Sequence, residues 1–377
     1  MSGDVNLQTA NNKFALLSYE TVNLGDEIQS LAAAQFLPRV DAYINREQMN
    51  QFVPADEQIH RLLLNGWFMH NPRNWPPSKF IEPLIISFHL NSVVGEAGIA
   101  PNSAMLSGAG IEYLKKFSPI GARDTSTLAL LEAAGVDAYF SGCLTLTLPR
   151  PSVSRDDDLI VVNDIPALTL RHLKSCTKKR VWEADQNTAD KNRLRRFSSA
   201  YKLLETYARA SFVVTTRLHC ALPSLAFGTP VLFLKADRDA LRFEGLDTLL
   251  NSCSVADFLT YETSRIDNPA ENPTRHLSIR QRLIETVEKF SGKHGCREQG
   301  PFHSVFGVEP HLLQVVEAAY RGILHRDPDE EGFLVYSTLL KREGLTGGTE
   351  KMIRQMLISP ECEAMRHKSV PHQVPLP

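Results

Sequence analysis

The sequence predicts an α/β protein with two Rossmann-like halves that face a cleft, followed by a small all-α module. Three observations predict this class. Short apolar runs alternate with helical segments through most of the chain, as in parallel sheets buried on both faces. A stretch rich in Pro, Ser and Asp interrupts the alternation near residue 150, and the region after residue 310 shows helical periodicity alone. We therefore expect domains at 1–150, 151–300 and 301–377, with a disordered end at 371–377.

The composition narrows the class of protein. Hydrophobic residues make up 43% of the 377 residues and charged residues 22%, as in soluble globular proteins. A net charge of −2 gives no basic field for nucleic acid. No apolar run approaches the ~20 residues that span a bilayer, and the N-terminus has no signal-peptide profile. The six cysteines are scattered, without a CxxC spacing. We expect a cytoplasmic protein that binds no nucleic acid and needs no metal.

The first half begins with a strand at 13–19, a polar turn and an Ala-rich helix at 28–36. Asn23, Gly25 and Asp26 lie in the turn. Gly25 permits the turn, and Asp26 is well placed to cap the helix. The alternative is that this loop contacts a sugar or a phosphate. No GxGxxG pattern is present, so no dinucleotide site follows.

Two further strands flank a long loop that is too rich in proline for a helix and carries Trp67, His70 and Trp75. The two tryptophans either stack on the apolar face of a sugar ring or pack the loop onto the body, and both interpretations stay open. His89 stands just past the second strand and is expected at the same edge of the sheet. We expect these strands at 62–67 and 83–88.

The first half ends with a short strand that precedes Arg123, a helix at 125–134 and a strand at 138–140. Arg123 is a candidate anion ligand, and Asp124 is a candidate helix cap.

The second half contains the most informative stretch. A buried strand at 211–214 ends in Thr216, Arg217, Leu218 and His219, and a small-residue helix follows. In open α/β sheets, ligands bind at the carboxyl ends of strands, and helix starts attract anions. A surface ion pair or a core histidine would explain either residue alone, but the pair at this junction favours a binding site. The other elements of this half are expected as strands at 159–162, 180–182 and 231–234 and helices at 194–209, 221–227 and 279–290.

Two further patterns concern this half and the tail. We interpret the basic run at 191–196 as a solvated helix face, and expect the helix at 279–290 to close the second half. Arg242 follows the last strong strand, again at a carboxyl end. The tail is expected to form helices at 312–324, 333–342 and 350–357, with a cap loop at 326–332 and a break at 344–348.

Two α/β halves with ligand edges at strand ends correspond to the glycosyltransferase-B layout. Within it, three motifs together resemble the polysaccharide pyruvyl transferase family over roughly residues 13–250. The motifs are Asn23-Leu24-Gly25-Asp26 with Gln29, Gly121-Ala122-Arg123-Asp124, and Arg217-Leu218-His219 with Gly228-Thr229-Pro230. The stretch from Asn65-Gly66-Trp67 to His89 looks like a bacterial branch of the family, although the glycine-rich strand end common elsewhere is here Asn65-Gly66-Trp67. The tail resembles a helical module of unknown function found on bacterial glycan proteins.

The resemblance implies transfer of the enolpyruvyl group of phosphoenolpyruvate to two hydroxyls of a sugar, giving a ketal and phosphate. It implies no cofactor besides this donor. His219 is then the candidate general acid, since its pKa is expected near working pH and the neighbouring phosphate would hold it protonated. His89 or Asp26 is the candidate for acceptor positioning or proton removal. The implied donor ligands are Arg217, Arg123, Leu218 and Thr216, and the implied acceptor ligands are Asn23, Trp67, His70 and Trp75.

Two other functions remain open from the sequence. One is a nucleotide-sugar glycosyltransferase of the same layout, because a helix start binds pyrophosphate as readily. The other is a non-catalytic glycan-assembly protein. The acceptor is expected to be a sugar or lipid-linked oligosaccharide, and residues 310–360 are the candidate contact with the membrane face or with assembly proteins.

Overall fold

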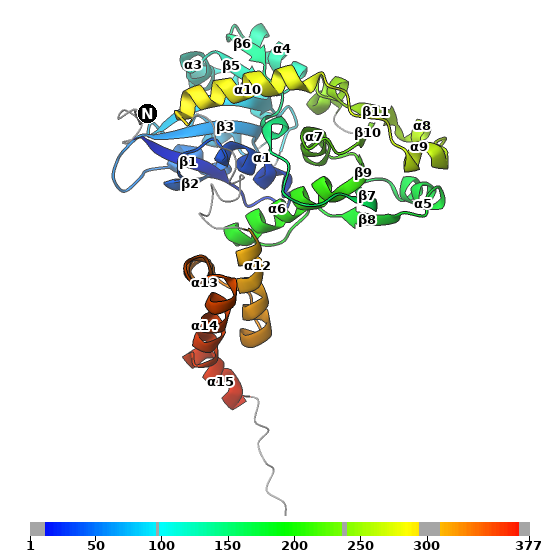
Figure 1. Cartoon of the computed structure of the whole chain (residues 1–377). Coiled ribbons are helices and arrows are strands. Elements are labelled where there is room, and N and C mark those ends of the chain that lie inside the picture. The colour runs from blue at the N-terminus through cyan, green and yellow to red at the C-terminus, as the bar shows by residue number, and fades with distance from the viewer. Residues whose placement is uncertain (1–11, 96–97, 236–239, 294–309, 369–377) are drawn as a thin grey trace, which may run out of the picture.

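The computed structural model describes residues 12–95, 98–235, 240–293 and 310–368. It contains two sheets whose strand pairs are all parallel, and a helical C-terminal region (Figure 1). The predicted α/β class with a helical tail is therefore confirmed. The expected disordered end at 371–377 lies outside the described residues.

The first sheet has six strands in the order β2-β1-β3-β4-β5-β6. Successive side chains of β1 point to opposite faces, so that Phe14 and Leu16 join one apolar core while Ala15 and Leu17 join another. The four-residue strand β2 was not predicted, because it is too short to show a pattern. The strands are β1 Lys13–Ser18, β2 Ala42–Asn45, β3 His60–Phe68, β4 Ile81–Leu90, β5 Ile120–Ala122 and β6 Ala138–Phe140. The helices of this half are α1 Gly25–Ala34, η2 Arg46–Gln51, η3 Pro72–Asn74, α2 Pro101–Met105, α3 Gly108–Lys116, α4 Thr125–Ala133 and η4 Leu144–Thr147.

The second sheet has five strands in the order β11-β10-β9-β7-β8. Its central strand β9 is buried along nearly its whole length, as its β-branched sequence predicts. The strands are β7 Asp156–Asn163, β8 Arg180–Ala184, β9 Ala210–Thr215, β10 Val231–Lys235 and β11 Asn251–Ser254. The helices are α5 Ala167–Ser175, α6 Arg193–Arg209, α7 Leu218–Ala226, η5 Ala240–Phe243, η6 Asp247–Leu249, α8 Val255–Phe258 and α9 Thr263–Asp267.

The long helix α10, His276–Ser291, follows the second half in sequence but packs on the first half (Figure 1). Arg280 donates a hydrogen bond of 2.8 Å to the carbonyl of Leu146. Ile279 lies against Gly142, where an added Cβ would come within 2.8 Å of its side chain. The expectation that this helix closes the second half was wrong, because its apolar face finds its partners around η4.

Helix α1 lies between the two halves and is buried at every one of its ten residues. It packs against α6, and Glu27 of α1 accepts a hydrogen bond of 2.6 Å from Nε of Arg196 of α6. Both side chains are only 2% exposed. Burial raises the pKa of Glu27 to about 7 despite the opposing charge of Arg196. The interpretation of residues 191–196 as a solvated face was therefore wrong.

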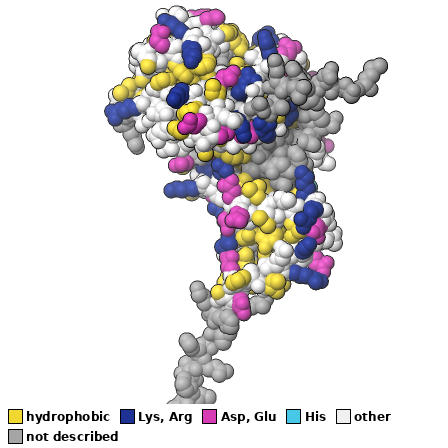
Figure 2. Space-filling view, turned by 90° about the vertical axis from the view of Figure 1, so that its left-hand side faces the viewer, with side chains coloured by type: hydrophobic (Ala, Val, Ile, Leu, Met, Phe, Trp, Pro, Cys, Tyr) yellow, Lys and Arg dark blue, Asp and Glu magenta, His cyan; other side chains and the backbone are white. Residues whose placement is uncertain are grey.

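The C-terminal module is joined to the body through α6. Lys202 pairs with Glu317 at 3.1 Å, Arg195 lies 3.4 Å from Asp327, and Arg193 pairs with Glu330. Figure 2 shows the module as a lobe of its own with hydrophobic side chains gathered on the face in view. The elements are α12 Pro310–Ala319, the π-helical turn η7 Tyr320–Leu324, α13 Glu330–Glu343, α14 Leu345–Leu357 and α15 Pro360–Lys368.

Two expectations for this module had different outcomes. Asp329 caps α13 by accepting a 2.7 Å hydrogen bond from the amide of Gly332, as the predicted cap loop requires. The break expected at 344–348 is confined to Gly344, because α14 already begins at Leu345. Gly348 lies inside that helix, where an added Cβ would come within 2.8 Å of Cα of Leu340, so it serves close helix packing. Among the helices of the described ranges, none combines the length and apolar character that crossing a bilayer requires.

The Glu27–Arg196 pair predicts a stability effect. Arg196→Met leaves a buried carboxylate without its partner, so we expect the free energy of unfolding to fall by about 3–5 kcal/mol at pH 8. The loss shrinks at pH 5, because the raised pKa of Glu27 means that the carboxyl is then protonated and carries no charge. Urea denaturation at the two pH values measures both effects.

The control is Arg180→Met, which removes an exposed partner of Asp156 and is expected to cost at most about 1 kcal/mol. Adding Glu27→Gln to Arg196→Met should recover most of the loss. Equal losses for the two arginine variants would contradict the importance of the buried pair.

Candidate active site

A cavity of about 470 Å³ lies where the second sheet ends and α7 begins. Residues from both halves line it, which brings together positions more than 190 residues apart in the sequence, Asn23 and Arg217 among them. A volume of this order suits a small ligand. The lining residues are Asn23, Arg123, Asp164, Ile165, Pro166, Gln186, Thr216, Arg217, Leu218, His219, Arg242 and Phe243.

The junction of β9 and α7 supplies four of these residues. Arg217 is the N-cap residue of α7, and its amide donates a 2.9 Å hydrogen bond to Oγ1 of Thr215. The helix begins at Leu218, three residues before its predicted start, so that His219 lies in its first turn. The amides of a first helical turn have no partner within the helix and favour an anion. The main chain at this junction therefore adds a positive end to the cavity.

Arg123 reaches the cavity from the end of β5. Only 1% of the residue is exposed, and its Nε lies 3.4 Å from Oδ2 of Asp124. Its terminal nitrogens, Nη1 and Nη2, have no hydrogen-bond partner among the described residues. A buried guanidinium without partners is costly, so these two nitrogens are positioned to bind an anion in the cavity.

Asp124 orients Arg123 through the contact with its Nε. It caps α4, as predicted, by accepting a 2.9 Å hydrogen bond from the amide of Thr127, and it also contacts Nδ1 of His89 at 2.6 Å. Burial would raise the pKa of Asp124, but the hydrogen bond from His89 and the charge of Arg123 hold it well below its usual range. Burial and Arg123 lower the pKa of His89 to about 4. At neutral pH, a neutral His89 therefore donates to an ionised Asp124.

His89 does not line the cavity. The structure therefore gives the predicted catalytic role of His89 no direct contact with a ligand in this cavity. The residue orients Asp124, and through it the guanidinium of Arg123.

His219 lines the cavity together with Arg123, Arg217 and Arg242. Burial lowers its pKa well below the usual value, and the charges of Arg123, Arg242 and Arg217 lower it further. The expectation of a pKa near working pH was wrong for the free protein, because the ring is buried and three guanidinium groups add to the effect of burial. Its Nδ1 lies against Gly25, where an added Cβ would be only 2.9 Å away. The imidazole is therefore neutral and closely packed when the cavity holds no anion.

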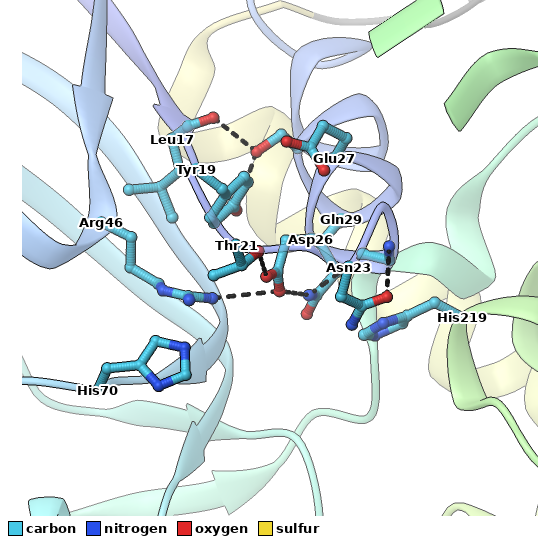
Figure 3. Close-up of polar contacts among 12 residues, drawn as sticks. Leu17, Tyr19, Thr21, Asn23, Asp26, Glu27, Gln29, Arg46, His70 and His219 are labelled. Carbon is cyan, nitrogen blue, oxygen red and sulfur yellow. Dashed lines mark hydrogen bonds and ion pairs between the residues drawn. The ribbon is translucent and has the colours of Figure 1, made fainter. Parts of the chain in front are cut away.

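Asp26 does not cap α1, contrary to expectation. The helix begins at Gly25, whose amide donates to Oδ1 of Asn23 at 3.0 Å, so Asp26 already lies inside the first turn. Its carboxylate instead accepts hydrogen bonds from Thr21 at 2.8 Å and from Arg46 at 3.1 Å (Figure 3). Asp26 does not itself line the cavity, but it is held beside Asn23, which does (Figure 3).

The predicted acceptor residues separate into two groups. Asn23 lies at the cavity. Figure 3 shows a polar row formed by Asn23, Asp26 and Arg46, with His219 beside Asn23 at one end and His70 beside Arg46 at the other. The ring of half-buried Trp67 lies 4.6 Å from that of exposed His70. Neither of these two rings lines the cavity.

Trp75 is a core residue. It is only 8% exposed and packs against Phe68 and Phe88, with ring centroids 6.3 and 5.9 Å away. The prediction that it forms part of an acceptor surface was wrong, because the loop folds this ring inward, as the alternative interpretation held.

Six lining residues were not among the predicted ligands, namely Asp164, Ile165, Pro166, Gln186, Arg242 and Phe243. Asp164 and Arg242 follow strands, so strand-end position was a usable signal for both. Gln186 follows β8 and donates a 3.1 Å hydrogen bond to the carbonyl of His219. No sequence pattern distinguishes it from other polar loop residues.

The two parallel sheets thus carry at their strand ends a cavity lined by three arginines, which suits a small anionic ligand. Residues 23–238, more than half of the chain, match the sequence profile of the polysaccharide pyruvyl transferase family. The chain belongs to this family of transferases. A search among curated proteins gives no match. Among solved structures, the chain is similar to a protein of uncharacterised function from Klebsiella pneumoniae, at 10% identity and a TM-score of 0.37, with 63% of this chain and 89% of that chain covered.

The contact between Gly25 and His219 yields a prediction. Gly25→Ala places a methyl group against the imidazole, so the ring must move outward, while alanine suits a helix better than glycine. We expect the free energy of unfolding to change by no more than about 1 kcal/mol and modification of His219 by diethyl pyrocarbonate to become several-fold faster. Peptide mapping by mass spectrometry measures the rate.

Gly347→Ala serves as the control, because an added Cβ there meets nothing within 4 Å. An unchanged rate for His219 in Gly25→Ala would show that the ring is not held by this contact.

Proposed function

We propose that the protein transfers the enolpyruvyl group of phosphoenolpyruvate to two hydroxyls of one sugar in a cell-surface glycan. The products are a cyclic pyruvate ketal and phosphate. One observation carries the proposal: two nitrogens of buried Arg123, which have no partner among the described residues, share a cavity with Arg217, His219 and the start of α7. A donor with one carboxylate and one phosphate requires this concentration of cationic groups.

The roles of the charged groups follow from their placement. Arg123 binds one anionic group of the donor with its paired nitrogens, and Arg217 and the amides of α7 bind the other. The position of His89 behind Asp124 supports a positioning role, since it acts on Arg123 and not on the reacting atoms. The proposal needs no metal and no cofactor besides the donor.

His219 is the proposed general acid. The negative charges of the donor offset the three guanidinium groups and raise the pKa of the imidazole, which takes up a proton. That proton is transferred to the methylene carbon, and the oxygen of the first hydroxyl bonds to the adjacent carbon. Phosphate then leaves, and the second hydroxyl closes the ring. One hydroxyl proton replaces the proton given by His219, and the other leaves with phosphate.

Asp26 is the proposed acceptor-side base. Its carboxylate lies beside Asn23, which reaches the cavity, and Arg46 keeps it oriented (Figure 3). Trp67 and His70 continue the polar row and are proposed to contact more distant sugars. In this arrangement the first half holds the acceptor and the second half most of the donor, as in a glycosyltransferase-B-like enzyme.

The proposal places the reaction in the cytoplasm, on a sugar or lipid-linked oligosaccharide. The C-terminal module at 310–360 is the proposed contact with membrane-bound assembly proteins, supported by its position outside the cavity lining.

The direct test is incubation of the purified protein with phosphoenolpyruvate and extracted glycan. We expect release of phosphate and a glycan mass increased by one pyruvate less one water. Thermal shift separates the competing donor class, since phosphoenolpyruvate should stabilise the protein more than sugar nucleotides do. Stabilisation by sugar nucleotides alone would favour a glycosyltransferase instead.

Arg217→Lys and Arg123→Lys test the donor ligands. Lysine keeps the charge but loses paired hydrogen bonds, so we expect kcat/KM for phosphoenolpyruvate to fall roughly 100-fold, the scale seen when one electrostatic donor is lost. Arg180 of β8 is exposed and does not line the cavity, so Arg180→Lys should retain the wild-type rate. Wild-type rates in both cavity variants would rule out these roles.

Donor binding at pH 7 should take up a proton at His219, because the negative charges of the donor offset the guanidinium charges that add to burial in lowering its pKa. Titration calorimetry in two buffers of different ionisation enthalpy measures the number of protons exchanged. His219→Gln should lose this uptake and reduce turnover by about 10²–10⁴-fold. Equal proton exchange in wild type and variant would exclude His219 as the proton acceptor.

A further inference from the structure

Each of the two donor arginines lies beside an aspartate, but the two aspartates are held differently. Asp124, beside Arg123, is 0% exposed and is bound by His89 and the amide of Thr127. It cannot move without breaking the start of α4. Asp164 has a side chain that is 58% exposed, and its Oδ2 lies 2.7 Å from Nε of Arg217.

The main chain of Asp164 is fixed by a hydrogen bond, whereas its carboxylate contacts Arg217 alone among the described residues. Asp164 follows β7 with a φ of +53°, a conformation that asparagine, aspartate and glycine tolerate best. Its carbonyl accepts a hydrogen bond from Oγ1 of Thr216. Within the described part of the chain, the contact with Arg217 is the only charged contact of its carboxylate. The carboxylate is therefore displaceable by side-chain rotation alone.

The position of this carboxylate places it in competition with a ligand. Asp164 and Arg217 both line the cavity, so an anion that binds Arg217 must approach the carboxylate of Asp164. Two anionic groups close together repel each other, and a partly exposed ion pair is weak enough to exchange.

We propose that Asp164 is an internal competitor for the anion site, which occupies Arg217 in the free protein and leaves it when a phosphate or carboxylate binds. The inference rests on the proposed function for the identity of the donor alone. Asp164 thereby limits the affinity of the cavity for inorganic phosphate, the product that three guanidinium groups would otherwise retain. The carboxylate of Asp164 thus weakens the binding of the product phosphate, which speeds its release, while the cavity can still bind the donor.

The test is Asp164→Asn in the full chain, because asparagine keeps the tolerance for a positive φ and removes the charge. Titration calorimetry with inorganic phosphate at fixed ionic strength measures the affinity. We expect Kd for phosphate to fall about five- to tenfold, the effect of removing one nearby charge in a partly exposed site. Phosphate should also inhibit turnover at correspondingly lower concentration.

Asp158→Asn is the matched control. Asp158 lies near the start of β7, whereas Asp164 follows its end, and it pairs with exposed Arg180 at 3.4 Å. The substitution therefore removes the same charge from the same region of the sequence. Its phosphate affinity should equal that of the wild type. Asp164→Gly, which also accepts this φ, repeats the measurement if the asparagine variant is poorly folded.

The outcomes separate this inference from the proposed function. Unchanged or weaker phosphate binding in Asp164→Asn overturns the inference and assigns Asp164 to orienting Arg217. Tighter phosphate binding without ketal formation in the wild type supports the inference and refutes the proposed function. Equal tightening in Asp158→Asn overturns the inference, because the effect would then be one of net charge.

Discussion

The burial of α1 between the two halves is the constraint on which the site depends. The Glu27–Arg196 pair joins α1 to α6 in a region that excludes water, and each charge requires the other to remain there. The contact of α1 with the second half also positions the loop before α1, since the amide of Leu24 donates a 2.7 Å hydrogen bond to the carbonyl of Gln186. The two loops that carry Asn23 and Gln186 thus reach the cavity together. Without this contact, Gly25 would not lie against His219.

The electrostatics of the cavity follow from that packing. Guanidinium groups from both halves share the cavity with a neutral imidazole, and an aspartate lies beside each of Arg123 and Arg217. The site favours an anion, because two buried nitrogens of Arg123 have no partner within the part of the chain that the structure describes. In the proposed mechanism, the anion raises the pKa of the histidine beside it. Binding and acid catalysis would then be coupled through one local charge balance.

The sequence predicted the site where local pattern carries the information. Arg123, Arg217 and His219 all follow short apolar runs, and ligands bind at the carboxyl ends of such strands, here β5 of the first sheet and β9 of the second. The errors arose where burial decides. Trp75 faces inward, residues 191–196 bind α1 and the C-terminal module, and α10 crosses to the other half. In each case the sequence showed the aromatic, basic or amphipathic pattern correctly. The residues against which each segment packs lie far away in the sequence, so the pattern did not identify them.

The sequence by itself determined the order of strands and helices, the polar residues at strand ends and the family motifs, because each depends on neighbours within one or two turns. Tertiary structure alone decided which strand ends share a cavity and which charges lie within reach of His219. It also decided that Asp26 pairs with Arg46, and that Asp164 stands at Arg217. The physical reason is that desolvation and Coulomb interactions depend on distances in space, and long-range packing sets those distances.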